Sequence, residues 1–324
     1  MSHNSHVSEP DFTITVTDIA MPTDAGVGKI GDLVVFVPGT VPGDRAIVRI
    51  VRHEKKYAYG ELISLEQPSE FRVEPQCPHF GKCGGCTIQS LQYAKQIKIK
   101  EAHLKQSLRR IGRLDIPEQV FEAITPSPLL YWYRSKIELS FGHCGQRVIA
   151  GMRPNLAPGL SNGSHVVPVH ECKVFSRSLG KILTVIEEFV HNEGLFPYDE
   201  KSKTGELRHL ILKESKASGK IMVIIETKGS RPIPMDALHY HLRREVPGYS
   251  SLYRIVNNRP GSFIDYSHVI LEAGDRAIDE EIGGLHFRIY PGSFFQPNPA
   301  GAALLYQSIR DMAAKRTFGN VLGL

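Results

Sequence analysis

The stretch CPHFGKCGGCTIQ, residues 77–89, constrains this chain most, because it places three of the five cysteines within ten residues. Cys77, Cys83 and Cys86 have the spacing C-x5-C-x2-C, and a tetrahedral metal or a cubane cluster requires a fourth ligand. Cys172 lies in a predicted loop that could return to these thiols, whereas Cys144 lies in a predicted hairpin turn. We therefore expect Cys172 to be the fourth ligand.

The spacing leaves the kind of metal open. Three clustered cysteines with one distant cysteine form a common iron–sulfur arrangement, and glycines let backbone N–H groups approach the sulfurs. Zinc sites usually pair two C-x2-C knuckles, and this chain has one, although His79 could replace a cysteine. The residues favour an iron–sulfur cluster over zinc, and zinc over redox thiols.

The composition is that of an ordinary soluble globular protein, with 41% hydrophobic and 23% charged residues. No apolar run approaches the roughly 20 residues of a membrane helix. The N-terminus, MSHNSHVSEP, lacks the basic region and apolar core of a secretory signal. We therefore expect a cytoplasmic monomer with no membrane partner, in a compartment where cysteines are more often ligands than disulfides.

Positive charge is concentrated around the cysteines. Residues 71–154 carry 13 Lys/Arg against 6 Asp/Glu, whereas residues 1–70 carry 6 against 10 and the remainder carries 20 against 18. A basic segment of this kind predicts a polyanionic partner, nucleic acid first. The alternative is a solvated face without a partner, and charge alone does not separate the two.

The first seventy residues are expected to form a small β-barrel after a disordered lead-in. Short alternating or apolar runs are separated by Pro-Gly turns such as PGTVPGD, which is typical of small OB-like barrels. The expected strands cover residues 12–17, 33–37, 46–51 and 57–65.

A basic helix is expected after the cysteines. Apolar residues recur at helical spacing through TIQSLQYAKQIKIKEAHLKQSLRRIGR, with Thr87 as a possible cap and Gly112 just past the end. This stretch carries seven Lys/Arg and one Glu, so its exposed face should be strongly positive.

The middle of the chain returns to strands. RSKIELSF at 134–141 alternates, which places Arg134 and Lys136 on one face, where they either contact RNA phosphates or merely solvate the strand. LRHLILKES and KIMVIIET are expected to pair around a turn, and a helix is expected at 176–192.

The end of the chain is expected to open an α/β domain. SFFQPNP forms a turn, Asn298 caps a helix that runs to about Arg316, and Pro299 is its first residue. The last residues, NVLGL, then begin a buried parallel strand. The alternative is an ordinary C-terminal strand of an existing sheet.

Together these motifs resemble the iron–sulfur subgroup of the RNA (uracil-5-)-methyltransferase family. GVGKIGDLVVFVPGTVPGD resembles the TRAM domain that opens those enzymes, and C-x5-CGGC-x2-Q followed by HxC resembles their cluster motif. YRSKIELSFG, LRHLILKES and SFFQPNP are similar to further family segments, and NVLGL resembles the start of the first S-adenosylmethionine-binding strand.

The resemblance implies that Cys77, Cys83, Cys86 and Cys172 bind a [4Fe-4S] cluster. It also implies that Gln296 reaches the S-adenosyl-L-methionine pocket, and that the basic helix packs toward the catalytic domain. The implied fold is α+β and multidomain: an OB-like TRAM barrel, a central mixed β-sheet domain with the cluster, and the start of a Rossmann-like methyltransferase domain. The expected segments are 1–10 (lead-in), 11–70 (TRAM barrel), 71–91 and 114–285 (central iron–sulfur domain), 92–113 (basic helix) and 286–324 (start of the methyltransferase domain).

The implied activity is C5-methylation of a single-stranded or flipped uridine in rRNA or tRNA. In this family a cysteine thiolate adds to uracil C6 so that C5 attacks the methyl group. That nucleophile and its general base follow the first cofactor-binding strand, so we expect this chain to bind RNA and the cluster but not to methylate alone. The alternative is a non-enzymatic RNA-binding protein with a structural metal site of four cysteines. Radical S-adenosylmethionine methylthiotransferases also carry TRAM, but their C-x3-C-x2-C motif and C-terminal TRAM do not match.

Overall fold

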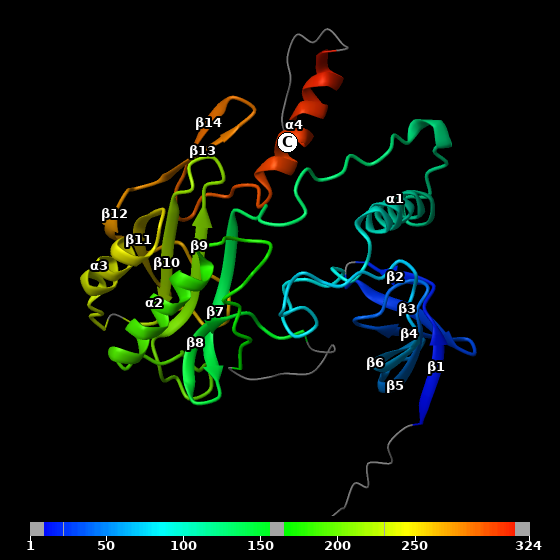
Figure 1. Ribbon diagram of the computed structural model, residues 1–324, viewed down its shortest axis with the longest axis horizontal. Coiled ribbons are helices and arrows are strands. Elements are labelled where there is room, and N and C mark those ends of the chain that lie inside the picture. The colour runs from blue at the N-terminus through cyan, green and yellow to red at the C-terminus, as the bar shows by residue number, and fades with distance from the viewer. Residues whose placement is uncertain (1–9, 22, 156–164, 230, 315–324) are drawn as a thin grey trace, which may run out of the picture. The chain divides into compact units, whose positions relative to one another are not determined.

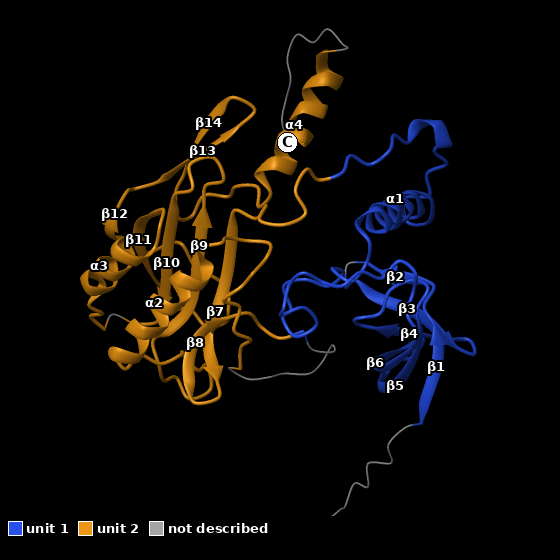
Figure 2. Cartoon of the chain, viewed as in Figure 1, with its two compact units in different colours: residues 1–126, 155–161 blue, residues 127–154, 162–324 orange. Residues whose placement is uncertain are grey.

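The computed structural model describes residues 10–21, 23–155, 165–229 and 231–314. The chain forms two compact units (Figure 2). The first comprises residues 1–126 with 155–161, and the second comprises residues 127–154 with 162–324. Each unit contains its own six-stranded sheet. The chain is thus a mixed α+β, multidomain protein.

The first unit begins with a sheet in the order β1-β5-β6-β4-β3-β2 (Figure 1). Its strands are β1 (Asp11–Thr15), β2 (Asp18–Ala20), β3 (Ala25–Ile30), β4 (Leu33–Val37), β5 (Arg45–His53) and β6 (Tyr57–Gln67). All neighbours are antiparallel except β4 and β6. The Thr17 N–H donates to the Val27 carbonyl at 2.8 Å, which ties the end of β1 to β3. The β-rich N-terminal domain predicted from the sequence is confirmed.

Alternate residues of these strands build the barrel core. In β4, Val35 and Val37 are fully buried, whereas Phe36 between them is half-buried on the outer face. The same alternation buries Ala58 between Tyr57 and Tyr59 of β6. The core cluster consists of Ile14, Val16, Val35, Val37, Ala46, Val48, Ile50 and Ala58.

A buried carboxylate, Asp44, joins the barrel to the chain that follows it. Asp44 is 0% exposed and accepts backbone N–H bonds from Val41 at 2.7 Å and Ser69 at 2.9 Å. The Arg72 guanidinium donates to both of its oxygens, at 2.8 and 2.7 Å. Because every one of these donors compensates the buried charge, Asp44 holds the loop after β4 and the exit from β6 together.

The basic helix expected at 92–113 is α1, Tyr93–Arg110, but Thr87 does not cap it. Gln92 is the N-terminal flanking residue, and Thr87 instead donates its hydroxyl to Asp24 at 2.5 Å. The segment before the helix is held elsewhere, because Leu91 is 1% exposed in a cluster with Ile19 and Val41. The helical spacing of apolar residues thus continues before Tyr93 into a loop that packs on the barrel.

The second unit is built on a sheet in the order β12-β11-β10-β9-β7-β8 (Figure 1). Its strands are β7 (Lys136–Cys144), β8 (Arg147–Gly151), β9 (Leu207–Glu214), β10 (Ile221–Thr227), β11 (Tyr249–Val256) and β12 (Val269–Gly274). Strands β10 and β11 are parallel, and the other pairs are antiparallel. The predicted pairing of LRHLILKES with KIMVIIET is confirmed by β9 and β10.

The two faces of this sheet are covered differently. Helices α2 (Leu179–Asn192) and α3 (Met235–Glu245) contact each other and lie over one face (Figure 1). On the other face, a second apolar cluster joins the sheet to the ribbon of β13 (Ile278–Ile282) and β14 (Leu285–Ile289). The apolar cluster does not extend over β7, and the face of β7 on that side of the sheet is polar.

Helix α4, Pro299–Ala314, follows the β13–β14 ribbon and a turn. The Asn298 side-chain oxygen accepts the Gly301 N–H at 2.9 Å, and Pro299 is the first helical residue, as predicted. The NVLGL strand that the sequence predicts lies outside the described residues. Among the described residues, no helix has both the length and the apolar character that a membrane span requires.

Candidate functional site

The loop that carries Gln296 is anchored to the start of β7. The Ser135 N–H donates to the Pro297 carbonyl at 2.7 Å, and the Ser135 hydroxyl donates to the Gln296 carbonyl at 3.1 Å. Asn298 donates its side-chain amide to the Ser127 hydroxyl at 3.2 Å. Gln296 itself is half-buried. The backbone of the loop is thus fixed on both sides of Gln296.

A buried lysine on β9 holds the same loop further upstream. The Lys213 ammonium donates to the carbonyls of Tyr290 and Ser293, each at 2.9 Å, and the residue is only 4% exposed. Burial, and then the positive charge of Lys136 on the neighbouring strand, lowers the pKa of Lys213 to about 8. Two independent anchors, Ser135 and Lys213, therefore hold the turn between β14 and α4.

The two phenylalanines of this turn have different environments. Phe295 packs on the apolar cluster of the second unit, with its ring centroid 5.6 Å from that of Phe287. Phe294 is 82% exposed. Phe295 therefore packs on the core, whereas Phe294 does not. Alternation along the turn places one ring inward and the next outward.

The predicted RNA-contacting residues lie at the start of β7. Arg134 is exposed and donates from Nε to the Lys136 carbonyl at 2.7 Å. The Lys136 ammonium pairs with Glu138 at 2.5 Å, so part of its charge is compensated. The predicted alternation is confirmed, because Ser135 and Ile137 are buried between these polar residues. Arg134 is thus the better placed of the two to contact a phosphate.

Arg134 also lies close to the loop of Cys172. Its N–H donates to the Val174 carbonyl at 2.9 Å, and the Trp132 N–H donates to the Lys173 carbonyl at 2.8 Å. The guanidinium of Arg177 lies 4.6 Å from the centroid of the Trp132 ring, and the ammonium of Lys173 lies 5.6 Å from it. Arg134 and Arg177 therefore place positive charge beside the Cys172 loop within the second unit, whereas Lys173 pairs with Glu171.

The three clustered cysteines lie in a compact loop of the first unit. The Cys83 N–H donates to the His79 carbonyl at 2.9 Å, and Gly81 turns the chain with φ 84°. The Gly85 N–H points at the Cys83 sulfur, at 3.3 Å. An N–H group directed at a cysteine sulfur is the interaction that tunes iron–sulfur ligands. The donor chemistry of this loop thus fits a cluster.

A complete metal site is not assembled. Cys172 belongs to the second unit, whereas Cys77, Cys83 and Cys86 belong to the first. In the part of the chain that the structure describes, no three His, Cys, Asp or Glu side chains are grouped so that they could hold a metal ion. Cys144, at the end of β7, faces Arg147 across the hairpin in the second unit. The four-cysteine set remains a prediction.

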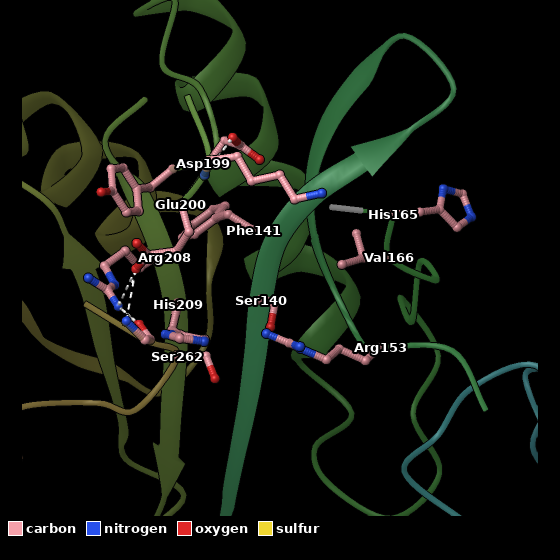
Figure 3. A pocket seen from close by; sticks show the side chains of 13 residues that line it. Ser140, Phe141, Arg153, His165, Val166, Asp199, Glu200, Arg208, His209 and Ser262 are labelled. Carbon is pink, nitrogen blue, oxygen red and sulfur yellow. Dashed lines mark hydrogen bonds and ion pairs between the residues drawn. The ribbon is translucent and has the colours of Figure 1, made fainter. Parts of the chain in front are cut away.

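A pocket of about 240 Å³ that the sequence did not indicate opens on the second sheet. Figure 3 shows Arg208 and His209 on one side of it, Arg153 and His165 on the other, and Ser140 between them. Arg208 is 6% exposed and donates to the carbonyls of Asn257, Arg259 and Gly261, so it supports the wall of the pocket. These residues come from strands and loops distant in sequence, so no local motif marks them.

His209 is held by a buried acid. Its Nδ1 lies 2.5 Å from the carboxylate of Glu226, which is 0% exposed. The Asn257 side-chain amide donates to the other oxygen of Glu226 at 2.7 Å. His209 is thus a hydrogen-bonded polar residue of β9.

Comparison with known proteins relates the two units to RNA-modifying enzymes. The TRAM domain profile matches residues 11–63, which are the barrel strands. The chain is 31% identical over 89% of its length to an uncharacterized RNA methyltransferase of Clostridium tetani, and it covers 61% of that protein. It is 33% identical over 89% of its length to an uncharacterized RNA methyltransferase of Caldanaerobacter subterraneus, and it covers 62% of it.

A solved structure shares the arrangement of elements within the units. The Pyrococcus abyssi tRNA (uracil-54, C5)-methyltransferase in complex with S-adenosyl-L-homocysteine matches 92% of this chain at 26% identity and a TM-score of 0.67. The chain covers 64% of that structure. The chain thus carries an N-terminal TRAM domain, is similar to RNA methyltransferases over about nine-tenths of its own length, and spans less than two thirds of theirs.

Proposed function

We propose that the whole protein is an S-adenosylmethionine-dependent RNA methyltransferase that modifies C5 of a uridine in rRNA or tRNA. The observation that carries this proposal is the likeness to a tRNA (uracil-54, C5)-methyltransferase over 92% of the chain, far beyond the TRAM domain. The 324 residues of this chain contribute RNA-binding surfaces, the Gln296 loop and the cysteine ligands.

In this proposal the Gln296 loop forms part of the cofactor pocket. S-adenosylmethionine supplies an electrophilic methyl group on a sulfonium centre when it is bound. The Gln296 side chain offers a carbonyl and two N–H donors, which suits the polar groups of that cofactor. The Ser135 and Lys213 anchors hold the backbone of the loop before any ligand arrives, which reduces the entropy lost on binding.

The four cysteines are proposed to hold a [4Fe-4S] cluster. Cys77, Cys83 and Cys86 lie in the loop before α1, and Cys172 lies in the loop before α2. Methyl transfer to a pyrimidine moves no electron to or from the protein. The cluster would therefore act by fixing the loops that carry its ligands, and the Cys172 loop accepts backbone hydrogen bonds from Trp132 and Arg134.

The RNA part of the proposal is tested by titrating the protein with fluorescein-labelled single-stranded RNA at several salt concentrations. We expect affinity to fall as salt rises, because phosphate contacts release counterions. Arg134→Ala should weaken binding and reduce the salt slope by roughly 0.7, the contribution of one phosphate contact on a single strand. Arg243→Ala, an exposed arginine on α3, is the matched control and should bind as the wild type does. An Arg134→Ala variant with wild-type affinity and slope would remove Arg134 from the interface.

A further inference from the structure

Three aromatic side chains gather on the outer face of the barrel. The ring centroid of Phe36 in β4 lies 5.4 Å from that of Tyr57 and 5.9 Å from that of Tyr59, and the two tyrosine rings of β6 lie 5.6 Å apart. Strands β4 and β6 are hydrogen-bonded neighbours (Figure 1). Their register places Phe36 directly beside Tyr59. We call Phe36, Tyr57 and Tyr59 the aromatic platform.

The platform is not part of the barrel core. The residues that alternate with it, Val35 and Ala58, are fully buried, whereas all three platform side chains are half-buried. A hydrogen bond to Tyr59 raises the pKa of Tyr57, so the two tyrosines orient each other. A solvent-side strand face normally carries polar residues, and a cluster of rings there marks a binding surface.

The positive charge of the barrel is concentrated beside this platform. Arg52, Lys55 and Lys56, at the β5–β6 hairpin, are exposed and are three of the six Lys/Arg of residues 1–70. The Arg52 guanidinium lies 6.0 Å from the centroid of the Tyr59 ring, although Arg52 also pairs with Glu54 at 2.5 Å.

Two other arginines of the barrel are compensated away from the platform. Arg45 pairs with Glu66 at 2.6 Å, and Arg49 pairs with Asp11 at 2.8 Å. The first seventy residues are acidic overall, with 6 Lys/Arg against 10 Asp/Glu, so the basic hairpin tip is a local feature. Its charge suits an anionic polymer whose bases reach the rings.

A pocket continues from the platform toward the cysteine loop. Its volume is about 230 Å³, and Tyr59, Pro38 and Gly39 form one part of its lining. Asp24 and Thr87 supply polar groups, and the Thr87 hydroxyl donates to the Asp24 carboxylate. Apolar walls with a few polar groups are suited to the flat face and polar edge of a nucleobase.

We propose that the aromatic platform and its adjoining pocket bind unpaired bases of single-stranded RNA, while Lys55 and Lys56 contact the flanking phosphates. This inference rests on the proposed function, because it takes RNA as the polymer, and it adds the site and its preference for single strands. Aromatic side chains stack on the faces of unpaired bases regardless of sequence. In a duplex these faces are covered by neighbouring base pairs, so duplex RNA does not engage the platform.

The test is equilibrium binding of a single-stranded RNA that contains 2-aminopurine, whose fluorescence is quenched when it stacks. Tyr59→Leu keeps the apolar bulk and removes the ring. We expect it to weaken binding about tenfold and to reduce the quench, with an unchanged salt slope. Tyr59→Phe retains the ring, so its RNA affinity and its 2-aminopurine quench should match those of the wild-type protein. Lys55→Ala should instead lower the salt slope by roughly 0.7 and leave the quench of the bound RNA intact.

Tyr240→Leu is the matched control, because Tyr240 is an aromatic residue 60% exposed on α3 of the other unit. If wild-type protein binds RNA but Tyr59→Leu and Phe36→Leu bind as Tyr240→Leu does, the platform is refuted while RNA binding stands. Wild-type binding without a quench, or equal binding of duplex RNA, also refutes it. If wild-type protein binds no RNA, the proposed function fails as well. If Tyr59→Leu does not fold, as judged by circular dichroism, the quench measured with wild-type protein and with Tyr59→Phe still tests whether the platform stacks on bases.

Discussion

Replacing Asp44 with alanine is expected to destabilise the barrel by about 3–5 kcal/mol, the usual cost of breaking a buried ion pair. Asp44 is 0% exposed and compensates Arg72 as well as two backbone N–H groups. Its removal leaves all of these donors without their acceptor. A domain is stable by only about 5–15 kcal/mol, so this loss is a large fraction of the total.

Hydrogen exchange of β5 amides, followed as a function of denaturant, measures the stability of the barrel itself. The only tryptophan, Trp132, lies in the second unit, so its fluorescence reports that unit separately. Asp32→Ala, at an exposed position of the β3–β4 turn, is the matched control and should change stability little. Asp44→Ala with wild-type protection in β5 would show that the Asp44 bonds do not support the barrel.

Replacing Cys86 with serine is expected to abolish the iron–sulfur cluster. Anaerobically purified wild-type protein should contain about four iron and four sulfide ions per chain, which is the content of one [4Fe-4S] cluster. Four thiolates hold such a cluster. Serine removes one thiolate, so we expect loss of both elements and of the visible absorbance. Cys172→Ser should have the same effect.

Cys144→Ser is the control for that experiment, since Cys144 lies at the β7–β8 hairpin and is not among the proposed ligands. It should retain full iron and sulfide. Zinc without sulfide in the wild-type protein would replace the cluster with a structural zinc site. Loss of iron in Cys144→Ser together with full iron in Cys172→Ser would show that the fourth ligand was assigned wrongly.

Local patterns predicted the strands well, because alternation reports directly which side chains face a core. The runs at β7, β9 and β10 lie where the sequence placed them, and the Asn298 cap before Pro299 follows from the side-chain chemistry of those two residues. Thr87 shows the limit of this reasoning. Its spacing suited a helix cap, but Leu91 packs on the barrel instead, against Ile19 and Val41, which are 50 or more positions away.

The features that sequence reasoning missed are all assembled from distant segments. Asp44 meets Arg72 only after the barrel closes, and Lys213 reaches the carbonyls of Tyr290 and Ser293 across 77 and 80 residues. The three residues of the aromatic platform lie in strands that the sequence predicts, but a single aromatic residue is common in any strand. Only the pairing of β4 with β6 shows that the three rings share one face.

The central claim, methylation of uridine C5, is tested most directly by nucleoside analysis. Unmodified rRNA and tRNA transcripts would be incubated with the whole protein and methyl-labelled S-adenosylmethionine, digested, and resolved by mass spectrometry. The account predicts label in 5-methyluridine, and a large loss of label with Gln296→Ala at unchanged RNA affinity. Label in a ribose or in another base, or undiminished 5-methyluridine with Gln296→Ala, would contradict the account.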